Sequence, residues 1–126
     1  MIYLFDTNIV IYYFNGLTAD QGLHQTLAES FNISVITRIE FLGWSEFVSD
    51  PRLYNQAQIF LGHAQVFDLS EEIVEQTIRL RQQFKIKTPD AIIAATALVN
   101  DLTVVTHNTD DFARLGLETL TVTMKS

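Results

Sequence analysis

Apolar residues along this chain gather in short continuous runs and in longer stretches with helical spacing. Residues 2–5 and 102–106 are runs without alternation, and residues 34–36 and 65–69 are short segments rich in β-branched or aromatic side chains. A strand that is covered on both faces of a parallel sheet has such a continuous run. These segments predict four strands, the first of them central, and residues 120–123 predict a fifth strand at an edge.

Helical segments separate the predicted strands, and several of them begin at a recognisable signal. Ser70, Asp50 before Pro51, and Thr88 before Pro89 are typical helix starts. Strands that alternate with helices through right-handed crossovers predict an α/β fold around a parallel sheet. At 126 residues, we expect one domain, residues 1–126. The predicted helices are residues 9–14, 20–30, a segment that begins at Glu40, 52–63, 71–84, 88–99 and a short one after 107–112. Asn32 closes the second of these helices, and the third carries Trp44 and Phe47. Residues 88–99 are nearly all apolar, so we expect this helix to be buried.

The composition narrows the classes of protein to which the chain can belong. It contains no cysteine, which excludes disulfides, a thiolate nucleophile and a cysteine zinc site. No apolar run approaches the roughly 20 residues of a membrane span, and no basic segment precedes the first run, so we expect a cytoplasmic protein. The formal net charge of −7 argues against a broad nucleic-acid surface, so nucleic-acid binding requires a metal ion and a local basic strip.

Asp6 stands where the first apolar run stops, and Thr7 and Asn8 follow it. In open α/β sheets, ligands bind outside the carboxyl ends of the strands, so Asp6 is a candidate site residue. The alternative is that Asp6 or Asn8 only caps the helix that follows, because Asp and Asn are preferred N-caps.

Further acids stand at or near predicted helix starts: Glu40, Asp90, Asp110 and Asp111. Each also has a structural interpretation, since Glu40 and Thr37 form a Thr-x-x-Glu capping box. If the strands are parallel, however, the starts of these helices lie at one edge of the sheet and their carboxylates can converge. Carboxylates at close range need a cation to stay ionised, and oxygen ligands select Mg²⁺ or Mn²⁺.

Lys85 and Lys87 lead directly into Asp90 and form a short basic strip. They are candidates for phosphate contacts, and a solvated helix face is the alternative. For Arg79, an i, i+4 ion pair with Glu75 is the simpler interpretation.

Four motifs stand out along the chain: Leu4-Phe5-Asp6-Thr7-Asn8, Ser34-Val35-Ile36-Thr37-Arg38-Ile39-Glu40-Phe41, Thr88-Pro89-Asp90-Ala91-Ile92-Ile93-Ala94-Ala95-Thr96-Ala97, and Val105-Thr106-His107-Asn108-Thr109-Asp110-Asp111-Phe112. In the order and spacing of these motifs, the whole chain resembles the PIN-domain proteins, in particular the VapC-type toxins of toxin–antitoxin pairs.

The resemblance implies a three-layer α/β/α fold with a five-stranded parallel sheet and a Mg²⁺-dependent endoribonuclease activity. Asp6, Glu40 and Asp90 match the three steadiest acids of the family. The fourth acid of the family corresponds to Asp111, to Asp110 or to the polar pair Asn108 and Thr109, and we favour Asp111. The expected substrate contacts are Thr7, Asn8, Lys85, Lys87, Asn108 and Thr109.

The resemblance also implies a homodimer and a small antitoxin that neutralises the protein. We expect this partner to cover part of the aromatic surface and to bring a cation to the acids. The aromatic residues in question are Tyr12, Tyr13, Phe14 and Trp44.

Two other functions remain as alternatives. One is a phosphatase or phosphotransfer protein with Asp6 as the nucleophile, although a phosphatase of the haloacid dehalogenase type would carry Asp where Asn8 stands. The other is an interaction module without catalysis, in which the acids only cap helices.

Overall fold

The computed structural model describes residues 3–19, 21–122 and 124–125. All strand pairs of its sheet are parallel, and the strand order is β3-β2-β1-β4-β5. This order confirms the predicted five-stranded parallel sheet, with β1 at its centre and β5 at an edge. The strands are β1 (Tyr3–Phe5), β2 (Asn32–Ser34), β3 (Gln65–Phe67), β4 (Thr103–Thr106) and β5 (Thr119–Thr121).

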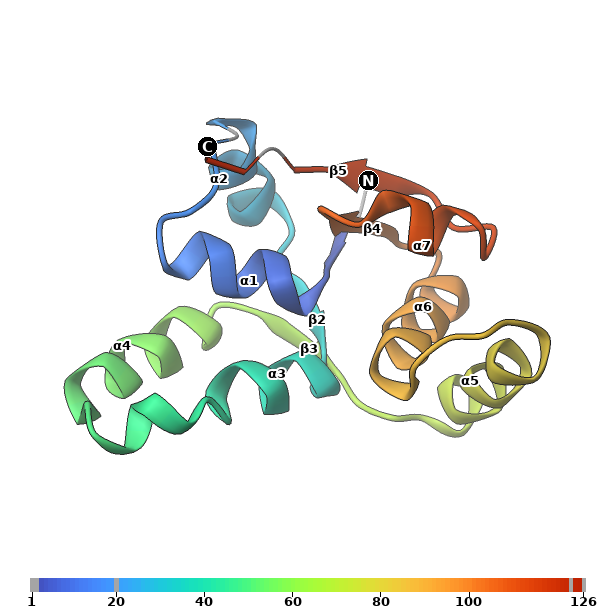
Figure 1. Ribbon diagram of the computed structural model, residues 1–126, viewed down its shortest axis with the longest axis horizontal. Helices are drawn as coiled ribbons and strands as arrows, with labels where there is room; N and C mark the ends of the chain where they lie inside the picture. The colour runs from blue at the N-terminus through green and yellow to red at the C-terminus, as the bar shows by residue number, and fades with distance from the viewer. Residues whose placement is uncertain (1–2, 20, 123, 126) are drawn as a thin grey trace.

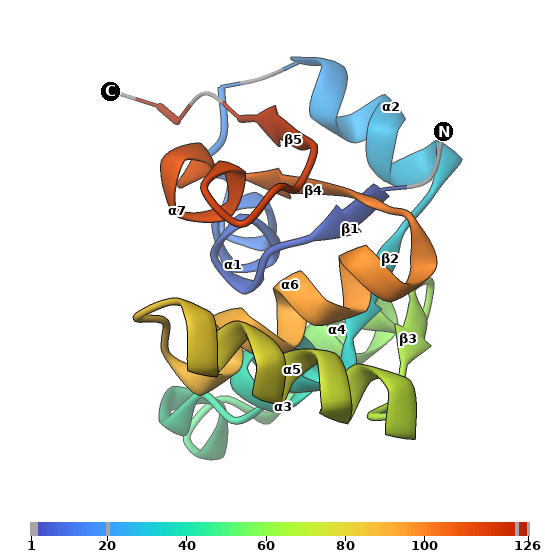
Figure 2. The same ribbon diagram turned by 90° about the vertical axis from the view of Figure 1, so that its right-hand side faces the viewer.

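Helices cover both faces of the sheet and form the outer layers of a three-layer α/β/α fold. Figure 1 shows α5 and α6 on one side of the strands and α1 and α4 on the other. Figure 2 shows α5 and α6 side by side below β1 and β4. The helices are α1 (Thr7–Phe14), α2 (Gln21–Glu29), α3 (Val35–Leu42), the 3₁₀ helix η1 (Ser45–Val48), α4 (Pro51–Leu61), α5 (Glu71–Gln83), α6 (Thr88–Asn100) and α7 (Thr109–Ala113).

Two apolar cores hold these layers together, one on each face of the sheet. Side chains alternate between the faces of a strand, so Leu4 of β1 packs with α5, α6 and α7, whereas Phe5 packs with α1, α3 and α4. As predicted, α6 is deeply buried, and every side chain from Ala91 to Ala97 lies in the interior. Both faces of β1 are therefore covered, which explains its continuous apolar run.

The connections of the chain reverse direction between β1 and β4. After β1 the chain continues into α1, whose Ile9 packs on one face, and after β4 it continues into α7, whose Phe112 packs on the other. Such a reversal opens a crevice at the carboxyl ends of the two strands, the preferred ligand position in open α/β sheets. Asp6 directly follows β1 at this point.

The second strand and the third helix begin earlier than the sequence predicted. Asn32 does not close a helix but begins β2, and Val35 and Ile36 belong to α3 rather than to a strand. The N-cap of α3 is Ser34, whose Oγ accepts a hydrogen bond of 3.1 Å from the backbone N–H of Ile36. Because α3 starts at Val35, the predicted Thr37–Glu40 capping box is wrong, and Glu40 lies near the end of the helix.

Several other boundaries differ by a few residues. Trp44 and Phe47 are not part of α3, which ends at Leu42; Trp44 is the N-cap residue of η1, and Phe47 lies within η1. Thr88 is the first residue of α6 and not its cap, because Lys87 occupies the N-cap position. β3 ends at Phe67, and β5 begins one residue earlier than predicted, while the predicted Ile2, Asp20 and Thr123 lie outside the described residues.

Other helix starts follow the predicted signals. The Asp50 carboxylate accepts from the N–H of Leu53 at the start of α4, and the Ser70 hydroxyl accepts from the N–H of Ile73 at the start of α5. Within the described ranges, none of the helices is long and apolar enough to cross a membrane.

Candidate functional site

Asp6 is a buried acid whose carboxylate faces the neighbouring strand. Its backbone N–H extends the sheet by a 3.0 Å hydrogen bond to the carbonyl of Val105. The side chain is 5% exposed, and its Oδ2 accepts a 2.9 Å hydrogen bond from the hydroxyl of Thr106. Asp6 occupies the N-cap position of α1, but its carboxylate makes no capping hydrogen bond. The capping interpretation therefore does not explain this carboxylate.

The surroundings of Asp6 favour its neutral form. Burial is the main reason that the pKa of Asp6 rises from 3.8 to about 6. The hydrogen bonds from Thr106 and from the backbone of Thr7 lower this pKa, whereas the negative charges of Asp90 and Glu40 raise it further. An acid of this kind is stabilised in its charged form by a cation.

Glu40 reaches the same region from the sixth position of α3. Its Oε1 accepts a 2.9 Å hydrogen bond from the hydroxyl of Thr7, and the Thr7 oxygen lies 2.8 Å from the hydroxyl oxygen of Thr37. The single proton of the Thr7 hydroxyl is donated to Glu40, so Thr37 is the donor to Thr7. Glu40 is thus held against the start of α1 and does not cap its own helix.

Asp90, in the first turn of α6, and Asp111 of α7 line a pocket of about 370 Å³. Burial and the charges of Glu40 and Asp111 raise the pKa of Asp90, and the Lys87 cation lowers it. Asn108 donates its side-chain N–H to the Asp111 carboxylate. Asp110 is exposed and does not line this pocket, so Asp111 is the one of the two that faces Asp90.

The structure brings most of the predicted site residues to this edge of the sheet. Lys85, Lys87 and Asn108 line the pocket of Asp90 and Asp111. Asn8 is exposed on the first turn of α1, and Thr109 begins α7. We refer below to the four carboxylates as the acidic site: Asp6, Glu40, Asp90 and Asp111.

Three residues of this region were not found from the sequence as members of the site. Thr37 was interpreted as a helix cap, and Thr106 had no local signal that linked it to Asp6, 100 positions away. Arg114 lines the pocket of Asp90 and is separated in sequence from the other two cations there. Only the pairing of β1 with β4 and the packing of α7 bring these groups together.

The acidic site has the chemistry of a site for a hard divalent cation, because all its donors are carboxylate oxygens that repel one another. Among the described residues, the side chains of acids and histidines form no group of three or more that is close enough to hold a metal ion. Three of the carboxylates each accept a hydrogen bond from a threonine or asparagine side chain. A cation that binds all four acids would have to bring their side chains closer together.

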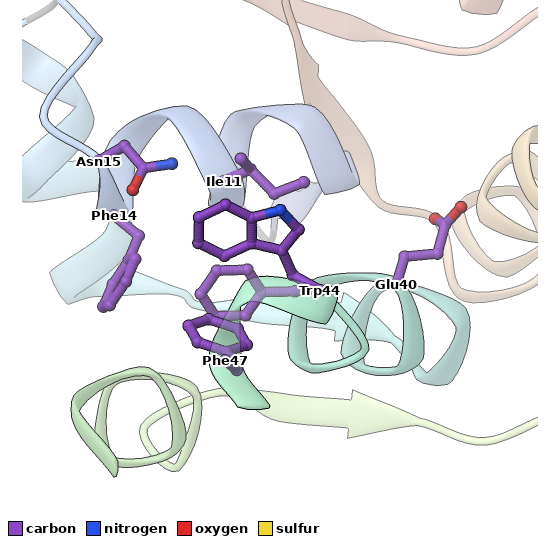
Figure 3. Close-up of a pocket in the computed structure, with 7 residues that line it drawn as sticks. Ile11, Phe14, Asn15, Glu40, Trp44 and Phe47 are labelled. Atoms are coloured by element: carbon purple, nitrogen blue, oxygen red, sulfur yellow. The ribbon is translucent and has the colours of Figure 1, made fainter. Parts of the chain in front are cut away.

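An apolar pocket of about 260 Å³ adjoins the acidic site between α1 and α3. Figure 3 shows Glu40 at one end of it, with the carboxylate directed away from the aromatic rings of Trp44 and Phe47. Trp44 is 48% exposed, so this pocket presents aromatic surface to solvent. Tyr13 is half-buried, stacks on Phe60 and does not line this pocket. We call this surface the aromatic pocket; it is lined by Ile11, Phe14, Asn15, Glu40, Phe41, Trp44 and Phe47.

Comparisons with known proteins agree with this architecture. A chain of a toxin–antitoxin complex from Klebsiella pneumoniae is 33% identical over 94% of this chain and 96% of its own, with a TM-score of 0.75. A chain of the DNA-bound VapBC2 complex from Rickettsia felis is 25% identical over 97% and 99%, with a TM-score of 0.76. A chain of the DNA-bound VapBC complex from Salmonella typhimurium, 21% identical over 96% and 98%, shares the fold with a TM-score of 0.83.

The comparison with curated proteins found no match. The family model of the PIN domain, in contrast, matches residues 3–117, from the start of β1 to the loop before β5. This span includes the four acids and the two pockets described above. By this match the chain belongs to the PIN-domain family.

Proposed function

We propose that the protein is a Mg²⁺- or Mn²⁺-dependent endoribonuclease and the toxin of a toxin–antitoxin pair. The observation that carries this proposal is the buried Asp6 at the carboxyl end of β1, beside Thr106 of β4, with a pKa raised by burial and by the charges of Asp90 and Glu40. A buried acid beside other acids has little structural purpose in itself, but it suits a cation. Membership of the PIN-domain family supports a nuclease.

In this proposal Asp6 and Asp90 hold the metal ion, and Glu40 and Asp111 assist directly or through water. When bound, the ion supplies a water of lowered pKa and neutralises charge on the scissile phosphate. The chain provides the positions of the ligands. Thr106 orients Asp6 and Asn108 orients Asp111, each by a hydrogen bond that fixes one carboxylate oxygen.

Thr7 and Thr37 have a corresponding role for Glu40. The two hydroxyls relay one hydrogen bond from α3 to α1 and back to the Glu40 carboxylate. This arrangement directs Glu40 towards Asp6 and Asp90, whose pKa values it raises. The Glu40 carboxylate, already held in place, can then act as a base and accept a proton from a nearby water molecule.

The substrate in this proposal is single-stranded or looped RNA. With a net charge of −7, the protein must bind phosphates locally, and Lys85 and Lys87 beside Asp90 are suited to this contact. Splayed bases and shape supply specificity in such RNA. Thr7, Asn8, Asn108 and Thr109 are the polar residues proposed to contact the strand.

The proposed partners are an antitoxin and a second copy of the chain. The similar chains from Klebsiella pneumoniae and Rickettsia felis were solved in toxin–antitoxin complexes. The aromatic pocket, with its exposed Trp44 next to Glu40, gives an apolar side chain of an antitoxin a place to bind. From there a cationic side chain of the antitoxin can reach the acidic site and neutralise it.

Cleavage of single-stranded RNA of mixed sequence tests the proposed activity. Wild type should cut it with Mg²⁺ or Mn²⁺ and stop in excess chelator. Asp6→Asn and Asp90→Asn should each lose about 100-fold or more of this activity, because even outer partners of metal ligands cost 10- to 100-fold. The control Asp110→Asn removes an exposed carboxylate outside the pocket and should cut like wild type.

The result that would contradict this proposal is cleavage that persists in Asp6→Asn, or cleavage that is absent from wild type with every metal. Absence of cleavage together with partner binding would favour the interaction module instead. The phosphatase alternative requires Asp6 as a nucleophile on a different fold family, and the PIN-domain match disfavours it.

A further inference from the structure

Arg114 directly follows α7 and lies at the pocket that contains Asp90 and Asp111. Its Nη2 donates a 3.0 Å hydrogen bond to the backbone carbonyl of Lys85, and its guanidinium carbon lies 5.9 Å from the centre of the Phe84 ring. A hydrogen bond and a ring contact together fix the plane of a guanidinium group. Arg114 is therefore oriented before any ligand binds.

The loop that joins α5 to α6, residues 84–87, is held from two sides. Arg81 donates to the carbonyl of Ile86 at 3.4 Å, and Arg114 donates to the carbonyl of Lys85. Figure 2 shows this loop and α7 on the same side of the molecule. The loop carries Lys85 and Lys87, so these contacts place three cations around one pocket.

The charge of Arg114 is not matched by a neighbouring carboxylate. Among the described residues, the only ion pair within 4.0 Å joins Arg79 to Glu75, both on α5. The known contacts of Arg114 are a neutral carbonyl and a ring, which take one of its five N–H donors. An oriented guanidinium with free donors, at a pocket that also holds two lysines, suits a phosphate group.

We propose that Arg114 is a substrate-binding residue that holds a backbone phosphate next to the one at the acidic site. This inference rests on the proposed function and adds to it a direction for the strand. The strand passes from Asp90 and Asp111 to the three cations that line the same pocket. Phosphate recognition of this kind needs no 2′-hydroxyl, so it applies to RNA and DNA strands alike.

The test measures binding of fluorescent single-stranded RNA and DNA of the same mixed sequence over a series of salt concentrations, with Ca²⁺ at a constant concentration in place of Mg²⁺ or Mn²⁺ to neutralise the acids. Arg114→Gln removes the charge, and Arg114→Met also keeps an apolar stem over Phe84. Arg79→Gln is the matched control, because Arg79 lies on the exposed face of α5. Arg114→Lys restores the charge.

We expect Arg114→Gln and Arg114→Met to bind both strands roughly tenfold more weakly, as for a lost hydrogen bond to a charged group. The slope of log K against log salt should fall by about 0.7, the value for one phosphate contact on a single strand. Arg114→Lys should recover the slope. Mn²⁺ binding, measured by the shift in melting temperature, should stay as in wild type for each folded variant.

Slopes equal to that of Arg79→Gln in the folded charge-removing variants would overturn the inference, since Arg114 would then only support the loop. Binding of neither strand by wild type would also overturn it. If wild type binds both strands with the expected loss in the variants but does not cut RNA, the inference stands and the proposed endoribonuclease activity fails.

Discussion

The Asp6 carboxyl group makes the stability of the metal-free protein depend on pH. Its pKa is about 6 in the folded chain and 3.8 in an unfolded one. Between these values the folded state binds more protons than the unfolded state, so the free energy of unfolding falls as the pH rises. A difference of about two pKa units corresponds to about 3 kcal/mol.

We therefore predict that wild type in chelator loses up to about 3 kcal/mol of stability from Asp6 between about pH 4 and pH 6.5. Asp6→Asn lacks this contribution. At pH 7.5 it should melt a few degrees above wild type, by roughly 1 kcal/mol, because the buried amide offsets part of the gain. Thermal unfolding of both proteins over this pH range provides the measurement.

The control for this prediction is Asp110→Asn, which changes an exposed carboxylate. It should follow the wild-type pH dependence. An Asp6→Asn protein that melts below wild type at pH 7.5 and keeps the same pH dependence would show that the carboxylate stabilises the fold.

At the scale of single residues, the sequence predicted an acid better than it predicted the partners of that acid. Asp6 could be predicted because a continuous apolar run stops there. Thr106 and Arg114 could not, because their roles depend on contacts across the sheet and between α7 and the α5–α6 loop. A hydroxyl at the end of a strand looks the same in sequence whether or not a carboxylate faces it.

At the scale of elements, α3 shows how a capping signal can be misplaced. Ser34 and Thr37 are both acceptable N-caps, and the Glu three residues after Thr37 favoured the later one. The ladder between β2 and β3 ends at Ser34, so the earlier start prevails. The shift of three residues turns Glu40 from a capping residue into one that faces the start of α1.

Substitutions of Ser34 and of Glu40 distinguish a helix capped by Ser34 from a Thr37–Glu40 capping box. Ser34→Ala should lower the free energy of unfolding by about 1 kcal/mol, because the Ile36 N–H loses its side-chain partner. Glu40→Gln keeps an oxygen for Thr7 and should change stability by less than about 0.5 kcal/mol. Urea unfolding measures both. The capping box would require the reverse order of the two effects.

A separate prediction concerns RNA binding by Lys85 and Lys87 of the α5–α6 loop. Replacing both with Ala should weaken RNA binding and flatten its salt dependence by about 1.4, which corresponds to two phosphate contacts. Mn²⁺ affinity should not fall, since neither lysine is a ligand and the loss of the Lys87 cation beside Asp90 does not disfavour a metal ion. An unaltered salt slope in the double variant would assign the two lysines to a solvated surface.

At the scale of the whole molecule, the parallel sheet collects the carboxyl ends of its strands at one edge. The alternation of strands and helices predicted a parallel sheet, and the α/β/α layers and the strand order around β1 confirm it.

The aromatic pocket is a surface that the alternation of strands and helices did not predict. It forms because α3 ends at Leu42 and the chain turns, so that Trp44 faces α1 and solvent.

If the aromatic pocket binds an antitoxin, the ring of Trp44 should contribute strongly to the affinity. Trp44→Ala should weaken the complex with the product of the adjacent gene at least tenfold, since buried Trp residues are frequent hot spots. Ile78→Ala is the control, because Ile78 is an exposed apolar residue on α5, in the opposite layer. Calorimetry of the copurified pair measures this. Equal affinities for the two variants would place the partner elsewhere.

The central claim of this account is that acids from four distant segments form one metal site. Titration calorimetry with Mn²⁺ at pH 7.5 tests it most directly. Wild type should bind the ion, Asp6→Asn and Asp90→Asn should each lose at least about tenfold in affinity, and Asp110→Asn should bind as wild type does. Mn²⁺ binding that is equally strong in Asp6→Asn, or that is absent from wild type, would contradict the claim.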